Sequence, residues 1–233
     1  MPTAEGAGLA SRRASSHYLC TYSPLTESRA GRIAIDTHGL PPFIDGSCRR
    51  EPDFQAAMPS ISALCRGSNF APRLQPGHRI AYISRKGQYA GGPGWCLVAL
   101  LTVHKRFESH EEAATWYRAQ RYALPSNCMV PGNRPQAYDR TNKNPSKEIK
   151  AILRAKNDVT LAMRCWDAGY TCRARRCGVF LVCRADYLQL WHPPVLRNAD
   201  MISIFCRVPI TQNPPRITVD EFELLAAYAV GVT

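Results

Sequence analysis

The stretch at residues 79–120 constrains the fold more than any other part of the chain. RIAYIS (79–84) favours a strand, and the glycine-rich basic loop RKGQYAGGPG (85–94) leads from it into the apolar run WCLVALLTVHKRF (95–107). Two β-prone segments joined by such a loop are typical of a hairpin. Ser109 and Glu112 then have the spacing of a capping box, which predicts a helix at 110–120. This stretch therefore predicts a strand, a loop, a long buried strand and a helix.

The remaining elements follow from shorter patterns. We expect further strands at HYLCTYS (17–23), at GRIAIDT (31–37), where Ile33 and Ile35 alternate with other residues, at CGVFLVC (177–183) and at MISIFCRV (201–208). Helices are expected at 58–65, at 147–156 and after the capping box Thr218–Glu221, with a loop at 127–146. Strands and helices in this mixture predict an α+β fold.

No internal repeat and no linker divides the chain of 233 residues. We therefore expect one domain at 17–233, preceded by a disordered basic arm at 1–16, which is rich in Ala, Gly, Ser and Arg without periodicity. Thirty Lys and Arg against eighteen Asp and Glu give a formal charge of +12. That surplus favours partners that carry phosphate, either nucleic acid or nucleotide.

Ten cysteines raise the question of disulfides or a metal. The chain opens without the features of a secretory leader and contains no apolar run near the roughly 20 residues that span a bilayer, so we expect a cytoplasmic protein with reduced thiols and no membrane contact. Cys165, Cys172, Cys177 and Cys183 lack the short paired spacing of zinc ligands. Cys177 and Cys183, six residues apart, are expected on one face of a strand. We predict no metal and no cofactor.

The loop GLPPFIDGSCRREPDF (39–54) combines rigidity with a high density of polar groups. Pro41 and Pro42 restrict the backbone, and Asp45-Gly46 is a turn pair. A hydroxyl, a thiol, two guanidinium groups and two carboxyls follow within seven positions, at Ser47, Cys48, Arg49, Arg50, Glu51 and Asp53. Such a set suits an anionic or strongly hydrogen-bonding ligand.

Two catalytic alternatives stay open. Cys48 precedes two arginines, and neighbouring cations lower the pKa of a thiol, although its base would have to be a spatially adjacent histidine. Without that base Cys48 is a packed thiol. Asp36 and His38 flank a threonine and could act as acid and base, or simply cap nearby amides.

Aromatic residues interleave with the basic groups, as a surface that stacks bases and binds phosphates requires. The basic groups are Arg49 and Arg50; Arg66, Arg73, Arg79, Arg85 and Lys86; and Arg173, Arg175 and Arg176. The alternative is that the aromatic residues belong to the core and the arginines are solvated.

PGHRIAYISRKGQY, followed by GWCLVALLTVHKRFESHEEAATWY, resembles the pattern of the PUA-like small β-barrels, the superfamily of the EVE, ASCH and YTH domains. IAIDTHGLPPFIDGSCRREPDF and PSISALCRGSNFAPRLQPG are similar to nucleotide-modification-associated domains of phages and bacteria. The resemblance covers roughly residues 17–120, with His78 in place of the aspartate of the family's turn. It implies a small mixed barrel flanked by helices, which holds a modified base in an aromatic-lined pocket.

From the residues and the resemblance together we expect nucleic-acid or nucleotide binding, with recognition of a modified base. Asp36 and Asp45 are the predicted acceptors for a base edge, and Cys48, which lies in the same loop as Asp45, is a further predicted ligand-binding residue. Phosphate contacts are predicted at Arg49, Arg50, Arg85 and Lys86, and stacking at Tyr82, Tyr89 or Trp95. The alternatives are an enzyme acting on a nucleotide or base through Cys48 or Asp36 and His38, and a protein-interaction module of a phage or defence system.

Overall fold

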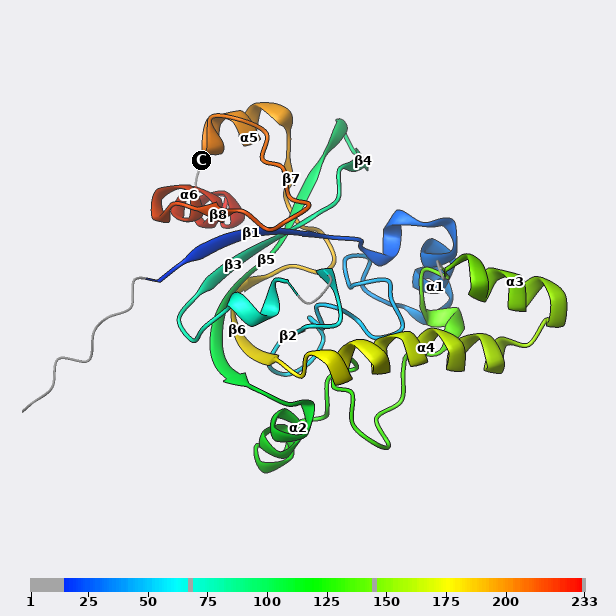
Figure 1. Cartoon of the computed structure of the whole chain (residues 1–233). Helices are drawn as coiled ribbons and strands as arrows, with labels where there is room; N and C mark the ends of the chain where they lie inside the picture. The colour runs from blue at the N-terminus through cyan, green and yellow to red at the C-terminus, as the bar shows by residue number, and fades with distance from the viewer. Residues whose placement is uncertain (1–14, 67–68, 144–145, 232–233) are drawn as a thin grey trace, which may run out of the picture.

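The computed structural model describes residues 15–66, 69–143 and 146–231, and a mixed sheet runs through its centre (Figure 1). Along the main path the strand order is β2-β6-β5-β3-β1-β8, with β4 and β7 also paired to β5. The strands are β1 (His17–Tyr22), β2 (Ser60–Ser62), β3 (Arg79–Ser84), β4 (Gly87–Tyr89), β5 (Gly92–Phe107), β6 (Phe180–Leu188), β7 (Val195–Leu196) and β8 (Arg216–Ile217). Among the strands of the described residues, β1 and β3 pair in parallel and all other pairs are antiparallel. Within the described ranges β2 and β8 do not pair, so the fold is α+β with an open sheet.

Six α-helices and three short 3-10 helices surround the sheet in the described chain (Figure 1). The α-helices are α1 (Arg29–His38), α2 (His110–Ala119), α3 (Lys147–Lys156), α4 (Val159–Arg176), α5 (Asn198–Phe205) and α6 (Val219–Ala229). The 3-10 helices are η1 (Leu25–Glu27), η3 (Ala71–Arg73) and η4 (Tyr138–Arg140).

The two faces of the sheet follow the alternation of side chains along each strand. In β1, Leu19 packs on the face covered by α5 and α6, where Phe205 and Phe222 are buried. Tyr18 and Tyr22 belong to the opposite face. Since successive side chains of a strand point to opposite sides, one strand supplies both cores.

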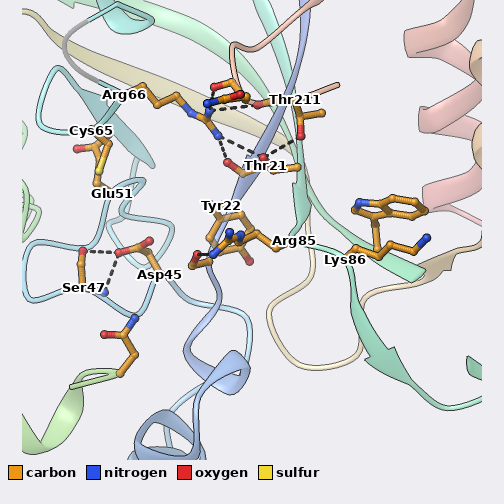
Figure 2. A pocket seen from close by; sticks show the side chains of 14 residues that line it. Thr21, Tyr22, Asp45, Ser47, Glu51, Cys65, Arg66, Arg85, Lys86 and Thr211 are labelled. Atoms are coloured by element: carbon orange, nitrogen blue, oxygen red, sulfur yellow. Dashed lines mark hydrogen bonds between the residues drawn. The ribbon is translucent and has the colours of Figure 1, made fainter. Parts of the chain in front are cut away.

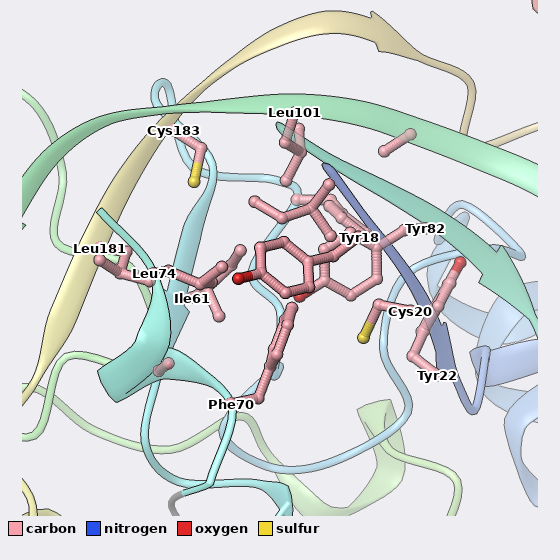
Figure 3. Packing of buried hydrophobic residues seen from close by; sticks show 14 of the residues in the cluster. Tyr18, Cys20, Tyr22, Ile61, Phe70, Leu74, Tyr82, Leu101, Leu181 and Cys183 are labelled. Carbon is pink, nitrogen blue, oxygen red and sulfur yellow. The ribbon is translucent and has the colours of Figure 1, made fainter. Parts of the chain in front are cut away.

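The opposite face is covered largely by the irregular chain between α1 and β3. Phe43, Phe54 and Phe70 from this chain belong to the same core as the aromatic side chains of the strands, and Figure 3 shows aromatic and aliphatic side chains converging under the sheet. Most of the loop at 39–54 is therefore buried, and it forms an inner layer of the molecule.

Several predicted elements are confirmed, with small shifts at their ends. Strands occur at 17–22 and 79–84, and β3 pairs antiparallel with β5 as the predicted hairpin requires, whereas the predicted loop at 85–94 contains β4, whose Gly87 pairs with Gly94 at the start of β5. The predicted helices at 110–120 and 147–156 are α2 and α3, and the Thr218–Glu221 capping box begins α6. At α2, Ser109 accepts from the Glu112 amide, but the Glu112 carboxylate accepts from Glu108 rather than from Ser109.

The predicted strand at 31–37 is wrong, because this segment lies in α1. Ser28 caps the helix by accepting from the Gly31 amide at 2.9 Å, and Gly39 ends it in the left-handed region at φ 59°. Gly31 and Ala34, three residues apart, are the buried positions, whereas Ile33 is 53% exposed. The apparent alternation of isoleucines thus did not mark a buried strand face.

Two further predictions exchange helix and strand. The expected helix at 58–65 contains β2, which pairs with the edge of β6. The expected strand at 201–208 is largely α5, in which Met201, Ile204 and Phe205 pack on the sheet at helical spacing. Short apolar runs are ambiguous between the two states, and the neighbouring sheet edge or face decides between them.

The strand that was predicted at 177–183 is β6, and it begins only at Phe180. Cys177 is the C-cap residue of α4, so it does not share a strand face with Cys183. The predicted arm at 1–16 lies outside the described residues except for Ser15 and Ser16. In the part of the chain that is described, no helix has the length and apolar character needed to cross a bilayer.

Candidate ligand-binding cavity

A cavity of about 720 Å³, called here the main cavity, lies where the end of β1 meets the loop at 39–54 and the start of the hairpin (Figure 2). Carboxyl groups line one side of it and basic side chains line others. Its lining residues are Thr21, Tyr22, Ser23, Asp45, Ser47, Glu51, Cys65, Arg66, Arg85, Lys86, Trp95, Asn142, Thr211 and Gln212.

Glu51 is the most unusual group in this lining. Its Oε1 accepts from the Ser62 amide at 2.8 Å, and its Oε2 accepts from the Ser62 hydroxyl at 2.5 Å and from Asn127 Nδ2 at 3.0 Å. Burial nevertheless raises the pKa of this carboxyl to about 8, against the lowering effect of these hydrogen bonds. Burial therefore favours the protonated form of the Glu51 carboxyl, which carries a hydrogen-bond donor.

Asp45 is the second carboxyl, and it comes from the turn of the same loop. Its Oδ1 accepts from the Ser47 amide at 2.9 Å and from the Ser47 hydroxyl, which fixes the turn. Burial also raises the pKa of Asp45 above its ordinary value. The charge of Asp45 in turn contributes to the raised pKa of Glu51, so ionisation of one carboxyl opposes ionisation of the other.

Cationic groups border the cavity from two directions. The Arg66 guanidinium donates to the carbonyl oxygens of Thr211, Gln212 and Thr21, which hold it in place. Arg85 and Lys86 are exposed at the beginning of the hairpin, on another side (Figure 2).

Arg85 and Lys86 make only weak contacts with other side chains. Arg85 Nη1 lies 3.4 Å from Glu27 Oε1. Lys86 Nζ donates to Asn198 Oδ1 at 3.1 Å and lies 4.7 Å from the centroid of the Trp95 ring. Exposed contacts of this kind contribute little stability, so both cations can turn toward an anion.

Four of the predicted site residues meet in this cavity: Asp45, Arg85, Lys86 and Trp95. Tyr82 lies behind it, in the lining of a smaller hollow, and Tyr89 lines a separate depression beside Phe43 and the hairpin.

The predicted pair on α1 does not reach the main cavity. Asp36 is exposed and is not among the lining residues. Its expected partner His38 lies instead with Nε2 2.9 Å from Asp139 Oδ2. The structure therefore does not bring Asp36 and His38 together at the cavity.

The Cys48-Arg49-Arg50 sequence faces the interior rather than the main cavity. Cys48 is fully buried against Leu64 and Tyr170, and burial raises the pKa of its thiol to about 12. Arg50 is almost fully buried and donates to the carbonyl oxygens of Asp45 and, at 2.8 Å, Arg140. For Cys48, the raising effect of burial on the thiol pKa thus outweighs the lowering effect of the neighbouring cation.

Arg49 connects the loop to α4. Its Nε and Nη2 donate to the two carboxylate oxygens of Asp167 at 2.5 and 2.7 Å, and Nη1 donates to two backbone carbonyl groups. It also lines a second cavity of about 680 Å³ with His110, whose pKa burial lowers to about 4. Arg49 and Arg50 are therefore occupied by structural contacts.

Sequence reasoning gave no role to Glu51, Cys65 or Arg66 as individual residues of the site. Glu51 lay in the polar loop and Arg66 in a basic group, which were the available signals. Asn142, Thr211 and Gln212 come from distant parts of the chain, and no local pattern marks them. Among the described residues, no group of three or more His, Cys, Asp or Glu is placed to hold a metal.

Comparisons with known proteins do not identify this cavity. No family model matches the chain, and neither the curated proteins nor the solved structures contain a match to it. The geometry of the cavity is therefore the observation that indicates a function.

Proposed function

We propose that this chain binds a nucleotide or a nucleic acid and takes up one nucleobase, unmodified or modified, in the main cavity. The observation that carries the proposal is the pairing of two buried carboxyls, Asp45 and Glu51, with basic side chains around the same cavity. A base needs donors and acceptors for its edge and an apolar surface for its ring, while its phosphate needs cations.

The base and the phosphate of a nucleotide each have a counterpart in the cavity. The protonated Glu51 offers a donor, and Asp45 offers acceptors, which suits the mixed edge of a base. Tyr22 and Trp95 supply aromatic surface, and the Tyr22 hydroxyl is already used in donating to the Phe43 carbonyl. Arg85 and Lys86 are placed at the exposed side for a phosphate.

The proposal includes a PUA-like barrel as the finer description of the fold. Supporting it, β5 is 16 residues long and pairs with β3, β4, β6 and β7, so that one strand joins most of the sheet.

Titration of labelled single-stranded DNA and RNA and of free nucleotides at two salt concentrations tests the proposal. We expect affinity to fall steeply with salt, because each neutralised phosphate releases counterions. Replacing Arg85 and Lys86 together with alanine should weaken binding. The slope of log K against log salt should then fall by roughly 1 for each phosphate that the variant no longer neutralises.

The matched control removes the same charge elsewhere. Lys105 and Arg118 are exposed and do not line the main cavity, so their double alanine variant should keep most of the affinity. A response to salt that is flat, or an equal loss of affinity in both double variants, would contradict the proposal.

A further inference from the structure

The hairpin of helices α3 and α4, at residues 147–176, carries much of the positive charge of this protein. Eight Lys and Arg against three Asp and Glu give these 30 residues a net charge of +5, out of +12 for the whole chain. About an eighth of the sequence thus holds about two-fifths of the charge surplus. The segment lies outside residues 17–120, so the family resemblance implies no role for it.

The acidic residues of this hairpin do not neutralise its cations. Asp158 caps α4, where its Oδ1 accepts from the Leu161 amide at 2.8 Å. Asp167 pairs with Arg49 of the loop at 39–54. Within the described ranges, no ion pair includes a cation of α3 or α4. The charge of these cations is therefore available to a partner molecule.

Each helix presents cations on an exposed face. On α3, Lys147, Lys150 and Arg154 have the spacing of one helical face, and all three are exposed. On α4, Arg164 and Arg175 are exposed and eleven residues apart, which is close to three full turns and about 16 Å along the axis. These five residues are called here the α3–α4 basic surface.

The apolar side chains of α3 distinguish this helix from helices that lie on membranes. Ile149 is buried, Ile152 and Leu153 are half-buried, and α3 contacts α4 (Figure 1). A helix that binds a membrane surface inserts an exposed apolar face into the lipid. The exposed face of α3 is cationic instead, which suits a hydrated polyanion such as a nucleic-acid backbone.

Two contacts hold α4 beside the main cavity. Asp167 pairs with Arg49, which belongs to the loop that also supplies both carboxyls of the cavity. Arg173 Nη1 donates to the Leu64 carbonyl oxygen at 3.0 Å, next to Cys65 in the cavity lining. The position of α4 is therefore fixed relative to the cavity.

The start of α3 is also close to the cavity along the chain. Asn142 lines the main cavity and Lys147 is five residues later, so their Cα atoms are at most about 18 Å apart. The phosphates of one strand repeat about every 3.4 Å along a duplex. A strand with one base in the cavity therefore reaches α3 within about five nucleotides.

We propose that the α3–α4 basic surface binds the sugar-phosphate backbone of the strand whose base enters the main cavity. This inference rests on the proposed function and assigns its ligand to polynucleotides rather than free nucleotides. Ala168 and Cys172, which lie between Arg164 and Arg175, are exposed and offer no strong hydrogen bond to a base edge. The surface thus positions the strand without reading its sequence.

Fluorescence anisotropy with single-stranded DNA and RNA of up to about 12 nucleotides tests the inference, with adenosine and cytidine monophosphate as the shortest probes. Wild-type affinity should rise with probe length. Lys150→Ala/Arg154→Ala and Arg164→Ala/Arg175→Ala should each reduce this rise and lower the salt slope by about 1.4, roughly 0.7 for each of two phosphates on a single strand. Their affinity for the monophosphates should equal that of the wild type.

Lys105→Ala/Arg118→Ala is the matched control, because it removes the same charge from exposed positions outside the basic surface. It should keep the full rise with length. The Arg85 and Lys86 variant should weaken binding of probes of every length, which distinguishes the cavity from the basic surface. Circular dichroism establishes that each variant is folded.

An affinity that does not rise with length, or an equal loss of the rise in the control, overturns this inference alone. So does binding of polyglutamate, or of vesicles of phosphatidylcholine and phosphatidylserine, as tightly as the longest oligonucleotide. Unchanged binding of all probes by the Arg85 and Lys86 variant overturns the proposed function, and with it the common strand proposed here.

Discussion

At the scale of single residues, burial decides the chemistry of the ionisable groups in this protein. Two arginines follow Cys48 in the sequence, yet burial raises the pKa of its thiol, and the nearby charge of Asp167 acts in the same direction. The cation that would oppose this effect, Arg49, is paired with Asp167 itself. The lowering effect of Arg49 on the Cys48 pKa is thus smaller than the raising effects of burial and Asp167 together.

The raised pKa of Glu51 predicts how the free energy of unfolding depends on pH. The folded protein holds its proton up to a pKa of about 8, whereas the unfolded chain releases it near the ordinary value of 4.5. Its contribution to the free energy of unfolding is thus complete below pH 4.5 and is lost as the pH rises through about 8. Glu51→Gln should remove this part of the pH dependence.

Urea unfolding between these pH values measures the effect. The wild type should lose stability as the pH rises, and the variant should follow a flatter curve, because an amide does not titrate. Parallel curves for the two proteins would show that Glu51 is not the titrating group.

At the scale of elements, α1 illustrates how packing settles an ambiguous pattern. Its capping residues, Ser28 and Gly39, were present in the sequence, but the alternation of Ile33 and Ile35 favoured a strand. The start of the helix packs closely on η1. A Cβ atom placed on Gly31 would lie 1.7 Å from the carbonyl oxygen of Leu25, so this approach requires a residue without a side chain.

Substitution of two helical glycines separates this close approach from helix propensity. Gly31→Ala should destabilise the protein by about 3 kcal/mol or more, since α1 and η1 would have to move apart. Gly169→Ala on α4 is the matched control, because nothing lies within 4 Å of the position that its Cβ atom would take. There alanine should stabilise by about 0.5–1 kcal/mol. Equal effects in denaturant unfolding would contradict the packing argument.

At the scale of the whole molecule, the loop at 39–54 joins distant parts of the chain. It packs beneath the sheet through Phe43 and Phe54 and contacts α4 through Arg49. Side chains from this loop, the hairpin and residues 211–212 then enclose the main cavity. The cavity consequently depends on the tertiary contacts of the loop.

The contact between Arg49 and Asp167 is the connection that a substitution can test. Asp167→Ala leaves a buried guanidinium without its carboxylate and should cost about 3 kcal/mol. Asp139→Ala removes the 59% exposed partner of His38 and should cost less than about 1 kcal/mol. Chemical unfolding of both variants measures the loss in free energy of unfolding. An equally small loss in Asp167→Ala and Asp139→Ala would show that the contact between Arg49 and Asp167 does not stabilise the protein.

The sequence predicted β3, β5 and α2 well, because these elements depend on local turn, capping and apolar patterns, whereas β4 lies inside the predicted loop at 85–94. It predicted β2 and α5 wrongly, since each is a short apolar segment whose state depends on what lies next to it. Of the site residues, Asp45, Arg85, Lys86 and Trp95 were found in regions chosen for turn chemistry and charge.

By itself the sequence determined the α+β class, the central hairpin and the places where polar loops and cations occur, because these depend on neighbours a few residues apart. Only the tertiary structure decided which of those groups face a cavity. Cys48, Arg49 and Arg50 are buried in structural contacts, while Glu51 and Arg66 line the main cavity beside Thr211. The reason is physical: burial and pairing depend on contacts between residues far apart in the chain, and those contacts also set the pKa of each group.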